Sequence, residues 1–515
     1  MCTYPKTKRN YTSRTVFPIK AMALSLVVFP ITLVQAQTSI WDGSVDGTWG
    51  DSENWSAGVP NGTSSIAEFS STSPNTSVNL DTAVELQRLD FLSGASSYDL
   101  SGSALTLTAA SGDTFIVNSS GAVQAISSNV TFNIYGAGTA INVGVDSGST
   151  LTLSGLLATN GTTNGRSITF SGGGTVNIAS GATFSSINAL ESASGTSLNF
   201  YATNSANINN FYASTGGRIN LFANLNSSRG LIVEGDGAGI YLSQSDLTLS
   251  GSNPAIGVNM RGKTAGATVT LGSDFSGTGT ANVYKNIFLN QASTAAENVT
   301  YRFYAATDNT LNLAGVISDS ATSGTGTVVE ISGGGTVLYS GSSANTSITP
   351  IVISSGVLQL GKSTGIDAIA GGSVTIQENG ELLLVNGNQI ADGVAIILEG
   401  GSFNVSSKTE TVGSLSVTFG GSLSVEAGAG ITFSSLSELS GILTIYGWSD
   451  ASSIIFNDTS GWTESALANV IFDGYGQGAA IDGNELVYAI PEASSSALLL
   501  TAIAALIVFR MKRRK

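Results

Sequence analysis

One short segment carries the charged residues that could do chemistry. Glu234 and Asp236 stand two apart in Val233-Glu-Gly-Asp-Gly, and Arg218 and Arg229 come shortly before them. Side chains two apart on a β-strand point to the same face. Carboxylates beside a basic residue can act as acid and base on an acidic polysaccharide. The same residues next to glycine are equally typical of a solvated turn, so we assign no residue a catalytic role.

Most other catalytic chemistry is excluded by residue types that the chain lacks. It contains no histidine, and its one cysteine is Cys2. Ser-His-Asp and Cys-His catalysis, imidazole zinc sites and disulfides in a processed chain therefore drop out. Asp42 and Asp46, each followed directly by a glycine, are the nearest approach to a calcium-binding loop, but the EF-hand pattern is absent. We expect no metal and no cofactor.

The charge balance argues against nucleic-acid binding. Half of the 20 Lys and Arg residues lie at the two ends of the chain, which leaves 10 basic against 34 acidic residues between Gln37 and Pro491, a net charge near −24. A phosphate backbone needs a basic patch. Such an acidic surface repels nucleic acid and favours solubility outside the cell.

Short runs of alternating apolar and polar residues recur along the chain and predict the elements that would position any site. Each run is typical of a strand with one buried and one solvated face. They include Leu105-Thr-Leu107, Val130-Thr-Phe-Asn-Ile134, Leu151-Thr-Leu153, Val176-Asn-Ile178, Leu423-Ser-Val425 and Leu443-Thr-Ile445. The sequence therefore predicts an all-β fold.

Glycine-rich turns separate these strands. The chain has 63 glycines, and the hexapeptide Ser-Gly-Gly-Gly-Thr-Val occurs at 171–176 and again at 332–337. Turns and short strands that alternate without helices can bury their apolar faces by coiling into a solenoid. We predict a parallel β-helix of about 18 to 22 coils, if each coil takes roughly 20 to 25 residues.

Three of the five tryptophans, Trp41, Trp49 and Trp55, fall close together near the start of the predicted solenoid. Exposed indoles could stack on sugar rings. The first coil of a solenoid also needs large side chains to cover its open apolar end. We favour the cap over the sugar platform.

Both ends of the chain carry export signals. Residues 1–36 form a signal peptide, with a basic region that ends at Lys20, an apolar stretch over 21–34 and cleavage between Ala36 and Gln37. An uncleaved N-terminal anchor is the alternative. Signal peptidase is therefore an expected partner.

The other signal is the C-terminal segment 490–515, in which Pro491 and Glu492 precede an apolar span and a basic end. We expect this span to form a single transmembrane helix, stopped on the cytoplasmic side by the basic cluster. The anchor residues are Ala497, Leu498, Leu499, Leu500, Ile503, Leu506, Ile507, Val508 and Phe509. The basic stop consists of Arg510, Lys512, Arg513, Arg514 and Lys515.

This C-terminal arrangement resembles the PEP-CTERM sorting signal of bacterial exported proteins. The resemblance implies recognition by an exosortase, a membrane enzyme that releases or re-anchors the protein at the cell exterior. Ala493 stands where the family has its second proline. The alternative is a tail that simply stays as a membrane anchor.

A second resemblance covers roughly 30 residues of the body. Gly333 to Gly341, Asn345, and Val352 to Gly361 are similar to the autotransporter-associated β-strand repeat, with its glycine-rich strand, Asn-Thr turn and closing G-x-L-x-L-G. It implies a β-helical surface protein and no particular activity. We expect a β-helix with its Trp-rich cap over 37–320, the repeat region over 321–489, and the sorting segment after it.

Together these features predict an exported, non-enzymatic protein of the cell surface or extracellular matrix. It would be anchored in the membrane at least transiently and would act as a structural or adhesive element, with extracellular polysaccharide as an expected partner. A polysaccharide lyase or hydrolase on the same scaffold is the competing class.

Overall fold

The computed structural model describes residues 37–136, 138–161, 165–226, 230–251, 256–291, 297–319 and 326–489. The predicted signal peptide and its cleavage residue Ala36 lie outside these ranges, as do Arg229 and the whole predicted segment 490–515 with Pro491 and Glu492. Within the described ranges, no helix is long and apolar enough to span a membrane.

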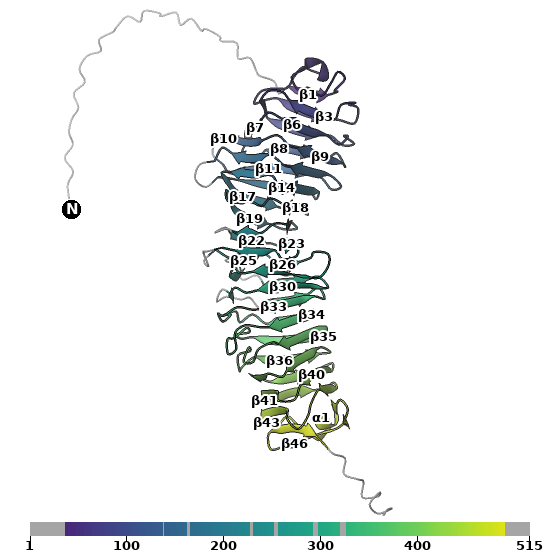
Figure 1. The fold of residues 1–515 in the computed structure, drawn as a ribbon, viewed down its shortest axis with the longest axis vertical. Helices are drawn as coiled ribbons and strands as arrows, with labels where there is room; N and C mark the ends of the chain where they lie inside the picture. The colour runs from purple at the N-terminus through teal and green to yellow at the C-terminus, as the bar shows by residue number, and fades with distance from the viewer. Residues whose placement is uncertain are drawn as a thin grey trace, which may run out of the picture. The chain divides into compact units, whose positions relative to one another are not determined.

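The predicted all-β solenoid body is confirmed: the described chain is a parallel β-solenoid of about 17 turns with almost no helix. Successive strands of each sheet lie side by side from β1 to β46 (Figure 1). All pairs of described strands are parallel except three at the C-terminal end. A parallel stack of this kind pairs the backbone of each coil with the coils before and after it, about 4.8 Å away.

Most coils between β2 and β33 pass through three sheets in turn. Sheet 1 contains β1 (Thr38–Trp41), β2 (Ile66–Phe69), β5 (Arg88–Phe91), β8 (Thr114–Asn118), β11 (Ala140–Val145), β14 (Arg166–Ser171), β17 (Ile187–Ser192), β19 (Ile208–Ala213), β22 (Gly230–Glu234), β25 (Val258–Gly262), β28 (Ile287–Gln291) and β31 (Ile317–Asp319). Sheet 2 contains β3 (Ser77–Leu80), β6 (Asp99–Gly102), β9 (Val123–Ile126), β12 (Thr150–Leu153), β15 (Thr175–Ile178), β18 (Ser197–Phe200), β20 (Arg218–Leu221), β23 (Ala238–Leu242), β26 (Thr268–Ser273), β29 (Thr300–Ala305) and β32 (Val328–Ser332).

A third set of strands occupies the next position in most of these coils. The early coils supply β4 (Val84–Leu86), β7 (Leu105–Ala110), β10 (Val130–Tyr135), β13 (Leu156–Thr159) and β16 (Thr183–Ser185). Later coils supply β21 (Leu225–Asn226), β24 (Thr248–Ser250), β27 (Gly279–Val283), β30 (Asn309–Leu313) and β33 (Thr336–Tyr339). The long strand β34 (Ile351–Leu360) joins two sheets, since its start pairs with β32 and its end with β33.

The stack continues through the second half of the chain in the same parallel manner. Its strands are β35 (Ser373–Leu384), β36 (Ala395–Glu399), β37 (Ser402–Ser406), β38 (Thr409–Val412), β39 (Leu415–Val417), β40 (Gly421–Val425), β41 (Gly430–Leu439), β42 (Leu443–Tyr446), β43 (Ser453–Asp458) and β44 (Val470–Phe472). Pairing runs without a break from β29 to β32 and from β30 to β33, on both sides of residue 320.

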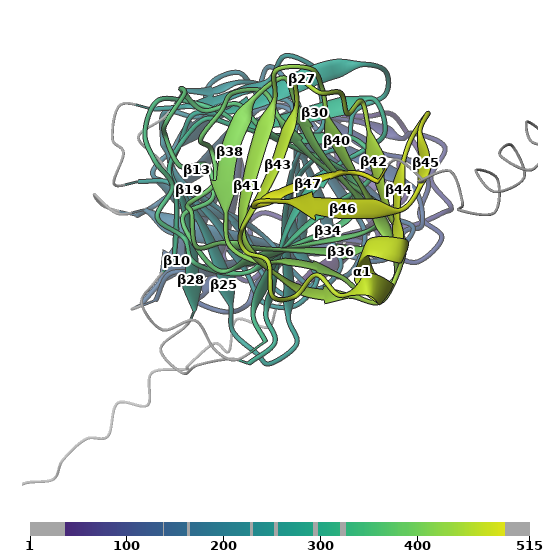
Figure 2. The ribbon, with the colours of Figure 1, turned by 90° about the horizontal axis from the view of Figure 1, so that it is seen from below.

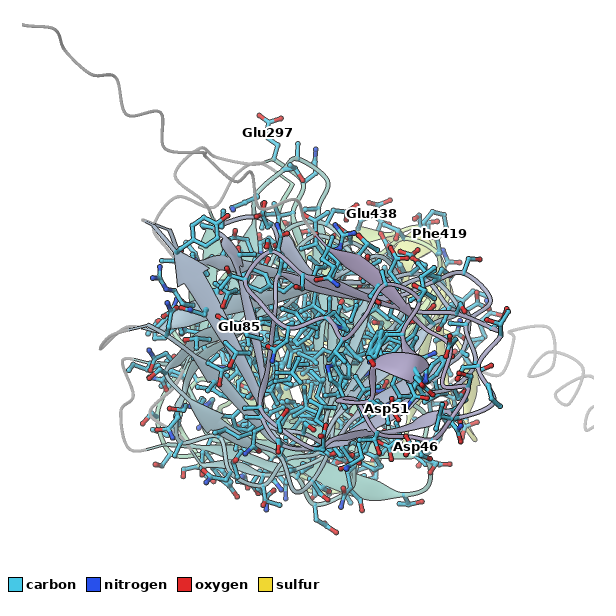
Figure 3. All side chains as sticks on the ribbon, turned by 90° about the horizontal axis from the view of Figure 1, so that it is seen from above. Asp46, Asp51, Glu85, Glu297, Phe419 and Glu438 are labelled. Atoms are coloured by element: carbon cyan, nitrogen blue, oxygen red, sulfur yellow. The ribbon has the colours of Figure 1, made fainter. Side chains whose placement is uncertain are left out.

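The predicted alternation buries one face of each strand. Leu151 pairs with Val176 and Leu153 with Ile178, and all four side chains are at most 1% exposed. The repeat length varies, since Phe211 pairs with Leu231 but Ile287 pairs with Ile317. The exposed side chains of Glu297 and Phe419 lie at the rim when the coils are viewed end-on (Figure 3). The interior is a column of buried apolar side chains with a few polar ones among them.

The three N-terminal tryptophans lie inside the first coil, around the short 3-10 helix η1 (Ser52–Asn54). Trp41, Trp49 and Trp55 are 0%, 1% and 4% exposed and pack around Phe69 of β2. Their indole N–H groups donate to backbone carbonyls of Asn75, Pro60 and Trp49, respectively. Buried and hydrogen-bonded in this way, the rings have no face free to stack on a sugar.

Antiparallel pairing closes the other end of the described solenoid. The strands β46 (Ala479–Asp482) and β47 (Glu485–Tyr488) form a hairpin, and β47 pairs with β43. A short strand, β45 (Gly476–Gln477), folds back on β44, and the single α-helix α1 (Glu464–Ala468) lies beside this hairpin (Figure 2). Covering the last parallel edge in this way removes a template for pairing with other chains.

Candidate functional site

Glu234, the first of the predicted acidic candidates, is the last residue of β22 and lies in a cluster of polar side chains on the outer face of sheet 1. Its carboxylate accepts a hydrogen bond from the Tyr212 hydroxyl and forms ion pairs with Arg261, at 3.3 Å between Nη1 and Oε2, and with Lys263. The Glu234 side chain is 7% exposed, whereas those of Arg261 and Lys263 are 38% and 55% exposed. Both cations reach over the carboxylate from solvent.

These partners control the ionisation of the cluster. Burial alone raises the pKa of Glu234, but hydrogen bonds from Lys263, Tyr212 and Arg261 outweigh it and hold that pKa below its usual value. Burial and the adjacent Glu234 carboxylate raise the pKa of Tyr212 well above its usual value. At neutral pH Glu234 is therefore a carboxylate and Tyr212 a neutral phenol, and neither is poised to transfer a proton.

The other described candidates, Asp236 and Arg218, do not join Glu234. Asp236 follows Gly235 in the turn after β22, is exposed, and its Oδ1 accepts a hydrogen bond from the Thr268 backbone N–H at 3.0 Å. Arg218 opens β20 in sheet 2, so it projects from a different sheet of the solenoid. The proposed strand spacing of Glu234 and Asp236 was wrong, because the strand ends between them.

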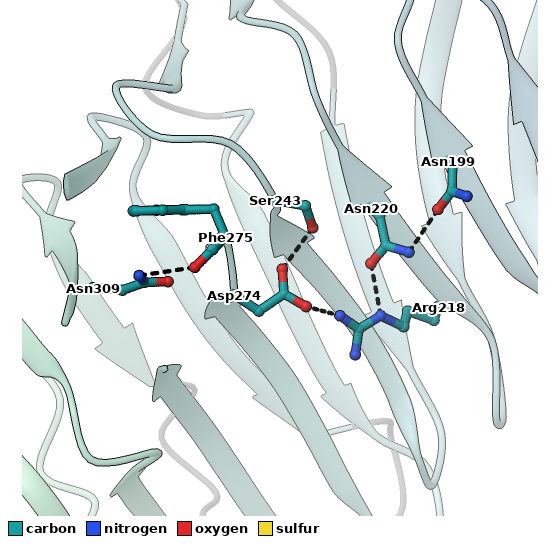
Figure 4. Close-up of polar contacts among 7 residues, drawn as sticks. All are labelled: Asn199, Arg218, Asn220, Ser243, Asp274, Phe275 and Asn309. Carbon is teal, nitrogen blue, oxygen red and sulfur yellow. Dashed lines mark hydrogen bonds and ion pairs between the residues drawn. The ribbon is translucent and has the colours of Figure 1, made fainter. Parts of the chain in front are cut away.

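Arg218 has its own partners on sheet 2 (Figure 4). Its guanidinium donates to Asn220 at 2.6 Å, pairs with Asp274, and lies 3.7 Å from the centre of the Tyr241 ring. Ser243 donates to the other Asp274 oxygen at 2.6 Å. With its charge paired and its face stacked, Arg218 is a structural cation of this surface.

The Tyr241 ring can lie flat there because two glycines leave room for it. A Cβ on Gly239 would stand 2.6 Å from the ring, and a Cβ on Gly272 would stand 2.9 Å from it. Glycine inside a strand often marks such a close approach. This was the signal in the sequence for a ring that lies along the sheet.

A ladder of amide side chains runs along the same face. Asn199 pairs in register with Asn177 and with Asn220, and its amide N donates to Asn177 at 2.9 Å, while that of Asn220 donates to Asn199 at 2.8 Å. Asn177 continues the ladder to Thr152 at 3.4 Å. A separate amide pair lies on the strands of the third position, where Asn312 of β30 donates to Asn282 of β27 at 2.9 Å. Each rung repeats the polar group of the previous coil at strand spacing.

No protein family, no curated protein and no solved structure matches the chain.

The acidic loops near the N-terminus serve to hold turns together. Asp46 accepts hydrogen bonds from the Thr48 backbone N–H at 2.7 Å and from the Asn54 amide at 2.9 Å, and these lower its pKa. Asp42 accepts from the Ser44 N–H at 3.0 Å. No group of three or more potential metal-ligating acidic side chains occurs among the residues that the structure describes.

A pair of substitutions separates the two acidic candidates. We expect Glu234→Gln to lower the free energy of unfolding at pH 7 by about 1 to 2 kcal/mol, since two cations lose their carboxylate. The loss should shrink as pH falls below 4.5, the ordinary pKa of a glutamate, because the unfolded wild-type chain then takes up a proton that the folded carboxylate does not, until the folded carboxylate is protonated too. Asp236→Asn, in an exposed turn, should change stability by less than about 0.5 kcal/mol. Urea unfolding at several pH values measures both, and equal losses would contradict this assignment.

Proposed function

We propose that this chain is an exported structural or adhesive protein of the cell surface or extracellular matrix, which acts by presenting repeated polar groups and not by catalysis. The amide ladder of Asn177, Asn199 and Asn220 is the observation that carries the proposal. Identical groups at a regular spacing can contact a repetitive polymer many times, so weak contacts add up to strong retention.

The polar clusters also favour binding over catalysis. Glu234 and Arg218, the candidate acid and base from the sequence, lie on different sheets, and each is held by partners of its own. The alternative of a polysaccharide lyase or hydrolase needs an acid and a base that face one substrate. No observation on these residues favours that second function.

Export and anchoring complete the proposal. Residues 1–36 act as a signal peptide cut by signal peptidase, and residues 490–515 act as a PEP-CTERM-like signal for an exosortase-like enzyme, with a transient or lasting membrane anchor. The acidic balance of 34 to 10 residues between the two signals supports an extracellular location. The autotransporter-associated repeat over 321–489 belongs to the same proposal, as a borrowed building unit of the solenoid.

The test uses the protein as its producing cells make it. Cells are separated into cytoplasm, membrane, envelope and medium, and the terminal masses of the recovered chain are measured. We expect a chain that begins at Gln37 in the envelope or medium and is retained on insoluble envelope glycan without turnover. An intact Met1 in the cytoplasm, or release of reducing ends or unsaturated sugars from neutral and acidic glycans, would overturn the proposal.

A further inference from the structure

Two aromatic rings lie stacked on the surface where β18 and β20 end. Tyr201 and Phe222 follow Phe200 and Leu221, which pair in register, so the two rings stand on neighbouring coils. Their centroids are 4.3 Å apart and their planes differ by 15°. Tyr201 is 37% exposed and Phe222 is half-buried. The chain therefore keeps an aromatic surface at this corner, whereas the three N-terminal tryptophans are buried.

The stack ends at Phe222. Leu221 pairs with Leu242, so the residue in line with Phe222 on the following coil is Ser243. Its short side chain is turned to Asp274, to which it donates at 2.6 Å (Figure 4). A serine cannot cover a phenyl ring. No third ring continues the column beyond Phe222 at this rung.

A depression of about 560 Å³ opens beside the stack. Tyr201 and Phe222 line it on one side, and the turn after β23 lines it on the other with Gln244 and Asp246. Asn224 also faces the depression, and its Oδ1 is fixed by the Thr248 backbone N–H at 2.7 Å. Asn224, Gln244 and Asp246 are all exposed. The depression thus combines aromatic rings with amide and carboxylate groups.

This combination fits one ligand chemistry. An aromatic face carries negative potential and attracts the polarised C–H groups on one face of a sugar ring. Amides can donate to and accept from hydroxyl groups, and a carboxylate can accept from them. Sites with a few polar groups around an apolar floor are typical of small-ligand binding.

We propose that the depression beside Tyr201 and Phe222 binds a neutral saccharide, with one sugar ring against the aromatic pair and its hydroxyls on Asn224, Gln244 and Asp246. The inference rests on the proposed adhesive function and names the ligand class of one contact point. A uronate is disfavoured because its carboxylate would approach Asp246 on a body with 34 acidic and 10 basic residues.

The test measures binding of defined probes to the chain isolated from its producing cells. Calorimetry with cellohexaose and maltohexaose supplies the neutral probes, a galacturonate hexamer the acidic one, and tetramethylammonium a cationic one. We expect a neutral hexasaccharide to bind best and Phe222→Ala to weaken it at least tenfold. Gln244→Ala, at an exposed position, should weaken it several-fold without changing the melting temperature. Tyr284→Ala is the matched control, since Tyr284 is an exposed ring away from the depression, at 56% exposure.

The outcomes separate the inference from the function on which it rests. Retention of wild-type and Phe222→Ala chains on envelope glycan to the same extent, with equal affinity for the hexasaccharides, would overturn the inference alone. Tighter binding of galacturonate or tetramethylammonium than of either neutral probe would also overturn it. A wild-type chain that binds neither envelope glycan nor any hexasaccharide would overturn both. If Phe222→Ala does not fold, the Gln244→Ala result decides.

Discussion

Replacing Gly333 by alanine is expected to lower the free energy of unfolding by about 3 to 5 kcal/mol, as conformational strain adds to overpacking. Gly333 adopts φ +107°, and a Cβ there would stand 2.3 Å from the Ala305 carbonyl oxygen and 2.8 Å from its carbon. These are backbone atoms of the preceding coil, held in place because Gly335 N–H donates to the same oxygen at 2.9 Å. Neither side of the contact can move cheaply.

Two other glycines provide matched controls for this change. Gly277 has φ +86° with nothing within 4 Å of its would-be Cβ, so Gly277→Ala should show only the conformational cost of about 1 to 2 kcal/mol. Gly181 has neither a positive φ nor a close neighbour, and Gly181→Ala should be neutral within about 0.5 kcal/mol. Urea unfolding followed by circular dichroism measures all three. Equal losses for Gly333→Ala and Gly277→Ala would show that the close approach is not what requires glycine.

Local patterns made the fold predictable. The two copies of Ser-Gly-Gly-Gly-Thr-Val form the same turn, since Gly174 and Gly335 each donate to a carbonyl of the preceding coil, at 2.8 and 2.9 Å. Gly172 matches Gly333, with φ +111° and a would-be Cβ 2.6 Å from the Val145 carbonyl oxygen. Turn dihedrals and period-2 burial are determined by a few consecutive residues, so one sequence suffices to find them.

The candidate site depended on which residues become neighbours across coils, and no local pattern gives that. A coil takes 20 residues from Phe211 to Leu231 but 30 from Ile287 to Ile317, so an assumed uniform spacing assigns the wrong partners. The coils are on average longer than the assumed 20 to 25 residues, so about 17 turns form where 18 to 22 were predicted. Arg218 thus meets Asp274, and Glu234 meets Arg261, instead of each other.

The aromatic pair did leave a trace in the sequence. Asn199-Phe-Tyr-Ala202 and Asn220-Leu-Phe-Ala223 share the same order of polar, core, aromatic and small residues, one coil apart. Aligning neighbouring coils by their buried positions would have placed the two rings together. The depression beside them depends on the turn after β23, whose course the alternation does not determine.

Glu410 is a buried carboxyl group in the interior of the solenoid that should make stability depend on pH. Glu410 occupies an inward position of β38, is 3% exposed, and pairs in register with the fully buried Ile431. It accepts hydrogen bonds from the backbone N–H of Gln389 at 2.7 Å and of Thr411 at 3.3 Å. Burial nevertheless raises the pKa of Glu410 from 4.5 to about 7, with a further contribution from the nearby Asp392.

Because the folded pKa of Glu410 is raised, stability should fall as pH rises. Between pH 4.5 and about 7 the folded chain keeps a proton on Glu410 that the unfolded chain has lost, so its stability falls as pH rises through that window. We expect the free energy of unfolding to drop by about 2 to 3 kcal/mol between pH 5 and pH 8 on account of this group, at about 1.4 kcal/mol per pH unit. The series starts at pH 5 because the pI is about 4.4.

Comparison with Glu410→Gln isolates this contribution from all other titrating groups. The amide cannot ionise, so the free energy of unfolding of the variant should not show this drop of about 2 to 3 kcal/mol between pH 5 and pH 8, whatever its absolute stability at pH 5. Glu438→Gln, at an exposed position, serves as the matched control and should keep the wild-type pH profile (Figure 3). Parallel profiles for wild type and Glu410→Gln in urea unfolding would mean that the carboxylate is ionised inside the solenoid and that its backbone donors outweigh burial.

Ionisation of Glu410 should also loosen its own coil. Amide hydrogen exchange at pH 8 should therefore quicken first in β38 and in the strand that pairs with it, β41.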